Sequence, residues 1–180
     1  MRLFAAIPLD SALQRELMLV QAGLALPRPV PAEMLHLTLA FMGEVDMETA
    51  EELDRRLSAI RASPFTLELR GAGMFGGPRP RSVHAGVPPD PALTSLQGKV
   101  TRAVRAAGIA PAHKRFIPHV TLGRIKPGEV TAPALERAVA GRANVLWGRQ
   151  DVRAFILYRS HPGRAGARHE ALAEYPLTPG

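Results

Sequence analysis

The chain has 180 residues, which fits a single domain, or a single domain made of two similar lobes. Hydrophobic residues make up 46% of it, enough for an ordinary packed core, yet the apolar runs are too short to cross a bilayer. Because cysteine is absent, disulfide frameworks and thiolate metal sites are excluded. The first apolar run ends at Pro8, too early for a secretory signal, so we expect a cytoplasmic protein with no membrane partner.

The formal net charge is +7, with 20 arginines against 3 lysines. An excess of this size attracts polyanions at long range, and arginine forms forked contacts with phosphate. A GC-rich genome would also produce abundant Arg, Ala, Gly and Pro. The charge is therefore compatible with nucleic acid but does not identify a partner by itself.

In the first half of the chain, apolar spacing and turn residues predict five elements in order. They are a strand at 3–7, a helix at 11–25, a strand at 34–42, a helix beginning near 47 and a strand at 65–69. Asp10 or Ser11 is suited to cap the first helix, and Asp46 the second.

The second half repeats this layout. After a Gly- and Pro-rich loop at 71–80, we expect a strand at 81–87, a helix capped by Asp90 and ended by Gly108, a strand at 117–125, a helix at 134–140 and a strand at 151–158. An exposed loop at 161–169 and a last strand at 173–177 complete the prediction. Each half thus reads strand, helix, strand, helix, strand, which indicates an internal duplication of layout.

One short phrase occurs in both halves, at the third element of each. His36-Leu37-Thr38-Leu39 and His119-Val120-Thr121-Leu122 share the form His, apolar, Thr, Leu. Side chains alternate between the two faces of a strand, so each phrase sends a His and a Thr to one face. Two such strands facing one another would place two imidazoles and two hydroxyls around one small polar space.

This arrangement suits acid–base chemistry at a phosphate group. One neutral imidazole can remove a proton from the attacking oxygen while an imidazolium protonates the leaving oxygen. The hydroxyls of Thr38 and Thr121 can donate hydrogen bonds to the phosphate oxygens. The sequence contains no HExxH motif, no cysteine ligands and no carboxylate cluster, so we expect neither a metal nor another cofactor.

Arg124 follows His119 at an odd offset and would face the opposite way on a regular strand. A bulge near Gly123 would turn it toward the histidines; otherwise it is a solvated arginine at a strand end. The remaining histidines lack the repeated pattern and are predicted to be ordinary: His84, His113, His161 and His169. The segment 113–116 fits either a nucleic-acid contact or a solvated loop.

The paired phrases resemble the 2H phosphoesterase superfamily. The stretches MRLFAAI at 1–7, LHLTLAFMG at 35–43, RPR at 79–81 and FIPHVTLGR at 116–124 are similar to the bacterial and archaeal RNA 2′,3′-cyclic phosphodiesterases, also called 2′-5′ RNA ligases. The resemblance implies an α+β fold over residues 1–180. It would have two pseudo-symmetric lobes, each an antiparallel sheet with outer helices, around a central cleft.

The same resemblance implies a role for each site residue. His36 would be the general acid, His119 the base that activates water, and Thr38 and Thr121 the groups that hold phosphate oxygens. The family's basic residue after the second phrase matches Arg124. Arg115 departs from the family, which often has proline before the equivalent of Phe116, and we expect this to affect loop stiffness more than chemistry.

These observations predict a monomeric, metal-independent enzyme that hydrolyses an RNA terminal 2′,3′-cyclic phosphate to a 2′-phosphate. Three alternatives stay open at this stage. They are a 2′-5′ RNA ligase acting on tRNA halves, a non-catalytic module that binds RNA ends, and a phosphodiesterase for a small cyclic nucleotide or ADP-ribose cyclic phosphate. The matched imidazoles argue against pure binding, and the net charge favours a polymer over a small molecule.

Overall fold

The computed structural model describes residues 1–110, 115–129, 132–163 and 166–179. The helices are α1 (Ser11–Gly23), the short 3₁₀ turn η1 (Ala32–Met34), α2 (Met47–Ser58), α3 (Pro91–Ala106) and α4 (Ala132–Ala140). The strands are β1 (Arg2–Pro8), β2 (His36–Glu44), β3 (Phe65–Arg70), β4 (Ala72–Phe75), β5 (Ser82–Gly86), β6 (His119–Arg124), β7 (Leu146–Val152), β8 (Ala154–His161) and β9 (Arg168–Pro176). In the described ranges, no helix is long and apolar enough to span a membrane.

Three predicted aspartate caps are confirmed. Asp10, Asp46 and Asp90 each accept a hydrogen bond at 2.8 Å from the backbone N–H three residues further along. Each bond satisfies one of the amide groups that the first turn of a helix leaves unpaired. In α3, Pro91 follows the cap, where its missing N–H costs nothing. Local sequence therefore determines where α1, α2 and α3 begin.

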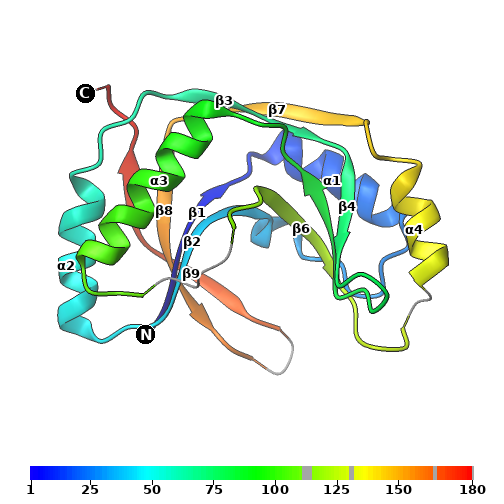
Figure 1. Cartoon of the computed structure of the whole chain (residues 1–180), viewed down its shortest axis with the longest axis horizontal. Coiled ribbons are helices and arrows are strands. Elements are labelled where there is room, and N and C mark those ends of the chain that lie inside the picture. The colour runs from blue at the N-terminus through cyan, green and yellow to red at the C-terminus, as the bar shows by residue number, and fades with distance from the viewer. Residues whose placement is uncertain (111–114, 130–131, 164–165, 180) are drawn as a thin grey trace.

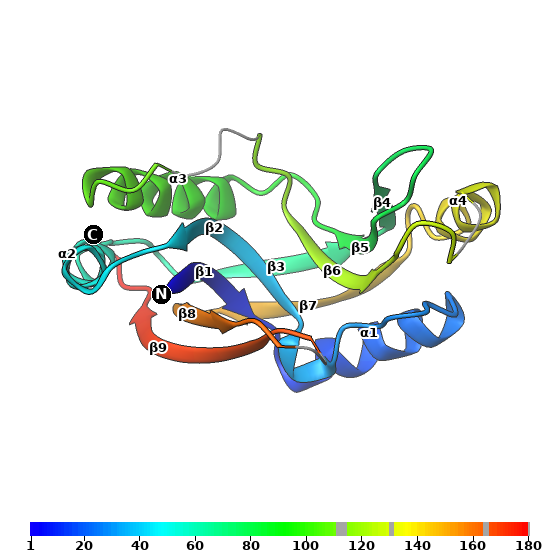
Figure 2. The same cartoon turned by 90° about the horizontal axis from the view of Figure 1, so that it is seen from below.

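Seven strands form one sheet in the order β4-β5-β6-β2-β1-β8-β9, and β3 pairs with β7 as a separate ribbon. Every strand pairing within the described residues is antiparallel, which confirms the α+β class. The molecule is an arch in which α2 and α3 lie at one end and α1 and α4 at the other (Figures 1 and 2). The β3–β7 ribbon runs between the two ends.

Two of the helices pack against strands from the other half of the chain. Although α1 follows β1, it contacts β6 and β7; although α3 follows β5, it contacts β2 and α2. The two groups, β1-β2-β8-β9 and β4-β5-β6, meet where β2 pairs with β6, and the register there is a single pair, Leu37 opposite Val120. This organisation is consistent with the predicted pair of lobes, and it brings the two repeated phrases to one junction.

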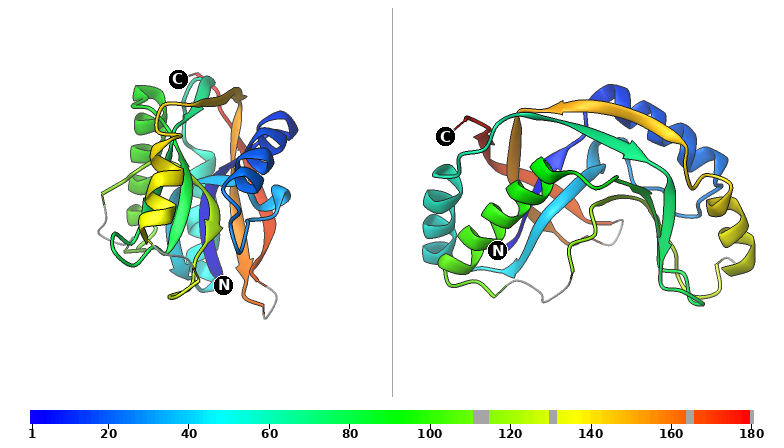
Figure 3. Two further views of the ribbon diagram at one scale, coloured as in Figure 1. Left: turned by 90° about the vertical axis from the view of Figure 1, so that its right-hand side faces the viewer. Right: turned by 45° about the horizontal axis from the view of Figure 1, so that its top comes forward.

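The seven-stranded sheet has an apolar face and a face that carries the histidines. On β1, Leu3, Ala5 and Ile7 belong to the main hydrophobic core. Phe4 is also buried, with 1% of its side chain exposed, but it lies outside that core. Because side chains alternate along a strand, Phe4 is on the opposite face, where other aromatic rings cover it. The curvature of the arch around this sheet is visible in Figure 3.

Two predictions about the strands were wrong. The interval 71–80 contains β4, which pairs with β5 from Ala72 opposite Ala85 to Phe75 opposite Ser82. Its sequence has no alternation of polar and apolar residues, so pairing with β5 and packing against α4 stabilise the extended form. The interval 151–158 is not one strand but the end of β7 and most of β8. Arg153 separates them, because the chain there leaves the β3–β7 ribbon and enters the larger sheet.

The predicted loop at 161–169 was too long. His161 ends β8, and Arg168 and His169 begin β9, with His161 opposite Arg168 and Ser160 opposite His169. Pairing with β8 extends β9 well before residue 173, where the apolar residues suggested that it begins. The first repeated strand also starts at His36 rather than at residue 34, because Ala32–Met34 forms η1.

A buried glutamine joins α1 to the second repeated strand. The Nε2 of Gln21 donates hydrogen bonds to the carbonyl oxygens of Val30 and Leu122, at 2.8 and 2.7 Å, and the side chain is 6% exposed. Leu122 also accepts from the N–H of Val30. Gln21 therefore supplies a partner for the Val30 carbonyl that no apolar residue could replace.

Replacing Gln21 with methionine should reduce stability, because the substitution keeps the volume but leaves the Val30 carbonyl unpaired. The expected loss in the free energy of unfolding is about 1–3 kcal/mol, measured by urea denaturation. The exposed Glu16→Met substitution on the same helix is the control and should cost less than Gln21→Met. Equal stabilities for the two variants would contradict this role for Gln21.

Candidate active site

The two repeated phrases lie side by side, as predicted. Leu37 and Val120 are fully buried and opposite one another, while His36, Thr38, His119 and Thr121 are half-buried on the other face. In an antiparallel pair, this register sets His36 opposite Thr121 and Thr38 opposite His119. Residues on the diagonal of such a pair have side chains about 7–8 Å apart. The two histidines therefore lie on one diagonal of this strand pair and the two threonines on the other.

Both imidazoles are oriented by the same local hydrogen bond. The Nδ1 of His36 lies 2.7 Å from the carbonyl oxygen of Met34, and the Nδ1 of His119 lies 2.7 Å from that of Ile117. A carbonyl can only accept, so Nδ1 carries the proton in each ring. Nε2 is then an acceptor in the neutral ring and a donor in the imidazolium. Each histidine can thus act as either base or acid through Nε2.

A bulge turns Arg124 onto the face of the histidines. Opposite β5, Val83 pairs with Gly123 and His84 with Thr121, so Leu122 is an extra residue on β6. This confirms the predicted bulge near Gly123. The charge of Arg124 lowers the pKa values of His36 and His169, which is consistent with its lying beside them.

The first repeated strand contains the matching bulge. On β2, Ala40 pairs with Ala5 and Thr38 with Ala6, so Leu39 is the extra residue. Leu39 and Leu122 each lie three positions after the histidine of their phrase. The residue equivalent to Arg124 is Phe41, which is 44% exposed and stacks on Phe4. The duplication therefore includes the backbone irregularity, with different side chains at the displaced position.

Aromatic rings surround His36. The ring of Phe4 lies 5.1 Å from it and that of Tyr158 lies 6.4 Å away, between ring centroids. His169 on β9 meets His36 edge-on at 5.2 Å and Phe4 at 4.7 Å. Sequence reasoning treated His169 as an ordinary loop residue, and this was wrong because the pairing of β9 with β8 brings it to the site.

His119 has a corresponding set of neighbours from β4 and β5. The ring of Phe75 lies 4.9 Å away at 76°, and that of His84 lies 5.3 Å away at 62°. His84 was also predicted to be ordinary, and its position beside His119 corrects that prediction. The only signal in the sequence was that His84 alternates with the apolar residues Val83 and Ala85.

Burial is the main electrostatic influence on the site. It lowers the pKa of His36 to about 4, with smaller contributions from the charges of His169 and Arg124; the bond to the Met34 carbonyl opposes the shift. Burial, followed by the charge of His119, lowers the pKa of His84 to about 4. Both rings are therefore neutral near pH 7 in the free protein.

Other candidate positions lie away from these residues. His161 pairs with Glu170 at 2.7 Å, whereas His113 and Lys114 lie outside the described residues. Within the described ranges, no group of three or more His, Asp or Glu side chains is arranged to hold a metal ion.

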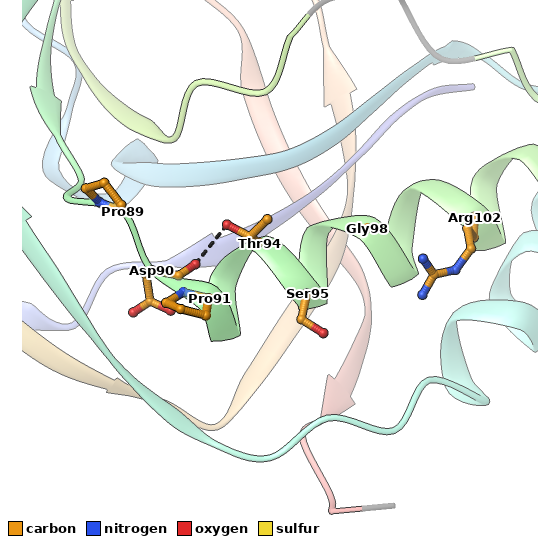
Figure 4. Close-up of a pocket in the computed structure, with 7 residues that line it drawn as sticks. All are labelled: Pro89, Asp90, Pro91, Thr94, Ser95, Gly98 and Arg102. Carbon is orange, nitrogen blue, oxygen red and sulfur yellow. Dashed lines mark hydrogen bonds between the residues drawn. The ribbon is translucent and has the colours of Figure 1, made fainter.

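A groove of about 550 Å³ runs along α3 and includes neither phrase (Figure 4). Two of its polar residues, Asp90 and Thr94, form hydrogen bonds within the first turn of the helix, at 2.8 Å each.

Replacing Arg124 with glutamine should raise the pKa of His36. The arginine's positive charge disfavours the imidazolium, so its removal makes protonation easier. NMR titration of the imidazole protons measures the change directly. Arg153→Gln is the control, because Arg153 is exposed and paired with Asp151. An unchanged pKa in Arg124→Gln would contradict the position of Arg124 beside His36.

The buried histidines should make stability depend on pH. Their folded-state pKa values are about 4, below the ordinary 6.5, so the unfolded chain takes up protons first as the pH falls. The free energy of unfolding should therefore decrease from pH 6.5 toward pH 4. Urea denaturation at pH 7 and pH 5 tests this, and His84→Phe should show a smaller decrease than the wild type. The same decrease in both proteins would count against a neutral, buried His84.

A sequence model of the 2′-5′ RNA ligase superfamily matches residues 10–164. A protein of Aeropyrum pernix named RNA 2′,3′-cyclic phosphodiesterase is 38% identical over 149 residues, which cover 82% of this chain and 84% of the relative. An Escherichia coli K12 protein of the same name is 33% identical over 181 residues, covering 98% and 97%.

Solved structures agree with these sequence matches. Escherichia coli LigT in complex with 3′-AMP superposes with a TM-score of 0.83 at 32% identity, and 98% of each chain is covered. A protein of Thermus thermophilus superposes with a TM-score of 0.80 at 29% identity, covering 99% of each chain. The match therefore extends over the repeated phrases, the strands that join them and the outer helices, and the chain belongs to the 2′-5′ RNA ligase superfamily.

Proposed function

We propose that the protein hydrolyses the 2′,3′-cyclic phosphate at an RNA end to a 2′-phosphate, without a metal ion. The observation that carries this proposal is the pair of imidazoles, His36 and His119, each with Nδ1 held by a backbone carbonyl at 2.7 Å. The relatives named RNA 2′,3′-cyclic phosphodiesterase support the same substrate class. The net charge of +7 favours a polyanionic substrate.

In this mechanism, the Nε2 of His119 removes a proton from water as the water oxygen attacks phosphorus. The bond between phosphorus and the ribose 3′ oxygen breaks, and Nε2–H of His36 protonates that oxygen. The product keeps its phosphate on the 2′ oxygen. Charge that develops on the non-bridging oxygens is stabilised by the hydroxyls of Thr38 and Thr121 and by Arg124.

The acid role of His36 requires a proton that the free protein does not hold near pH 7, because its pKa is about 4. An anionic phosphodiester beside the ring has the opposite effect to Arg124 and favours the imidazolium. Protonation of His36 would therefore accompany substrate binding. His36 would thus be neutral in the free protein and would take up a proton when a negatively charged phosphodiester binds beside it.

An oligoribonucleotide that ends in a 2′,3′-cyclic phosphate tests the proposal, with EDTA present. The wild type should release an RNA bearing a 2′-phosphate. His36→Ala and His119→Ala should each lower kcat by at least about 100-fold, the usual contribution of general acid–base catalysis. His161→Ala, which removes a partly exposed histidine paired with Glu170, is the control and should keep wild-type activity.

Abolition of activity by EDTA, or full activity in both alanine variants, would contradict the mechanism. Joining two RNAs would use the same groups in the same direction, with a ribose 5′ hydroxyl in place of water as the nucleophile that attacks phosphorus. Adding an acceptor RNA with a 5′ hydroxyl to the assay therefore separates the hydrolase from the ligase. A joined product in excess of the hydrolysed one would favour the ligase.

A further inference from the structure

His84 lies next to a catalytic residue but takes no part in the reaction proposed above. It belongs to the middle of β5, between Gly73 of β4 and Thr121 of β6. Its neighbours along the strand, Val83 and Ala85, are fully buried in the core. Alternation therefore places His84 on the face that carries the two repeated phrases.

Gly73 provides the space for the His84 ring. A Cβ atom at position 73 would come within 2.5 Å of the ring Nε2 and 2.8 Å of Cε1, closer than real Cβ contacts. Gly73 does not have a positive φ, so backbone conformation does not account for a glycine there. The imidazole lies directly over the β4 backbone, and a larger residue at position 73 would displace it.

Three rings meet beside this glycine. His84 stacks on Phe75 with centroids 4.3 Å apart and planes 24° apart. His119 presents its ring at a steep angle to both, 4.9 Å from Phe75 and 5.3 Å from His84. Steep edge-to-face contacts of this kind are favourable and depend on ring orientation. Phe75 and His84 together therefore define the plane that the His119 ring can adopt.

One of the two ring nitrogens of His84 is closed to a substrate. Its Nδ1 is buried and has no hydrogen-bond partner within the part of the chain that the structure describes. Its Nε2 lies over Gly73. The ring is neutral near pH 7, because burial lowers its pKa to about 4, so it does not repel an imidazolium on His119. His84 thus contributes an uncharged ring surface.

We propose that His84 is a positioning residue for His119. The carbonyl of Ile117 holds Nδ1 of His119, while His84 and Phe75 fix the ring plane, so that Nε2 faces the space between the two phrases. This inference rests on the proposed role of His119 as the base. His84 acts through its shape, and a phenylalanine at the same position would serve.

Three variants test the contact from both sides. His84→Ala removes the ring, Gly73→Ala displaces it, and His84→Phe keeps an aromatic ring without nitrogen. We expect the first two to lower kcat about 10- to 100-fold with KM unchanged, since small misplacements of catalytic groups have costs of this size. His84→Phe should keep most of the wild-type kcat. Gly98→Ala is the matched control, because a Cβ there meets only ordinary contact, 3.7 Å from Arg102.

A second measurement does not depend on turnover. Nuclear Overhauser contacts between the His119 and Phe75 rings should be present in the wild type and in His84→Phe, and lost in His84→Ala. Thermal unfolding confirms that each variant is folded. Unchanged kcat and unchanged ring contacts in His84→Ala would overturn the proposal. An equal loss of activity in His84→Phe and His84→Ala would also overturn the proposal, because it would mean that His84 acts through a ring nitrogen.

The two proposals fail in different ways. If the wild-type protein does not hydrolyse the cyclic phosphate, the proposed function is wrong, but the ring contacts still show whether His84 positions His119. If the wild-type enzyme is active and His84→Ala has the same kcat and the same contacts between the His119 and Phe75 rings, only the positioning role is wrong.

Discussion

The site depends on one short contact, the antiparallel pairing of β2 with β6 at Leu37 and Val120. Both side chains are fully buried, so their packing in the core determines the register of the two strands. A shift by one residue would turn the histidine and the threonine of one strand into the core and its apolar residues outward, and exposing these apolar side chains would cost a large free energy. The same apolar residues that hold the two halves together therefore determine which face carries the imidazoles.

Duplication explains why the arrangement is nearly symmetric and where it is not. Both strands have an Nδ1–carbonyl bond of 2.7 Å and an extra residue three positions after the histidine. The bulges displace different side chains, the exposed Phe41 in one half and Arg124 in the other. Helix α1 packs against β6 and β7, and α3 packs against β2, so each half of the chain contacts the other through a helix. These contacts help to stabilise the narrow junction at Leu37.

Much of this could be predicted from residues close together in the chain. The alternation within each phrase, the caps at Asp10, Asp46 and Asp90, and the bulge needed for Arg124 all follow from local rules. His84 and His169 could not be placed this way. Each reaches the site only through pairing with a distant strand, and His84 also needs the space left by Gly73. The extended form of β4 depends in the same way on β5, since its own sequence has no strand pattern.

In the proposed mechanism, two imidazoles act on one phosphate through their Nε2 atoms. The most direct measurement is a crystal structure of the protein bound to a dinucleotide product that carries a 2′-phosphate. Nε2 of His36 and Nε2 of His119 should both lie within hydrogen-bonding distance, about 2.7–3.2 Å, of oxygens on that phosphate or on the 3′ carbon. A phosphate bound by only one of the two rings, or elsewhere on the sheet, would contradict it.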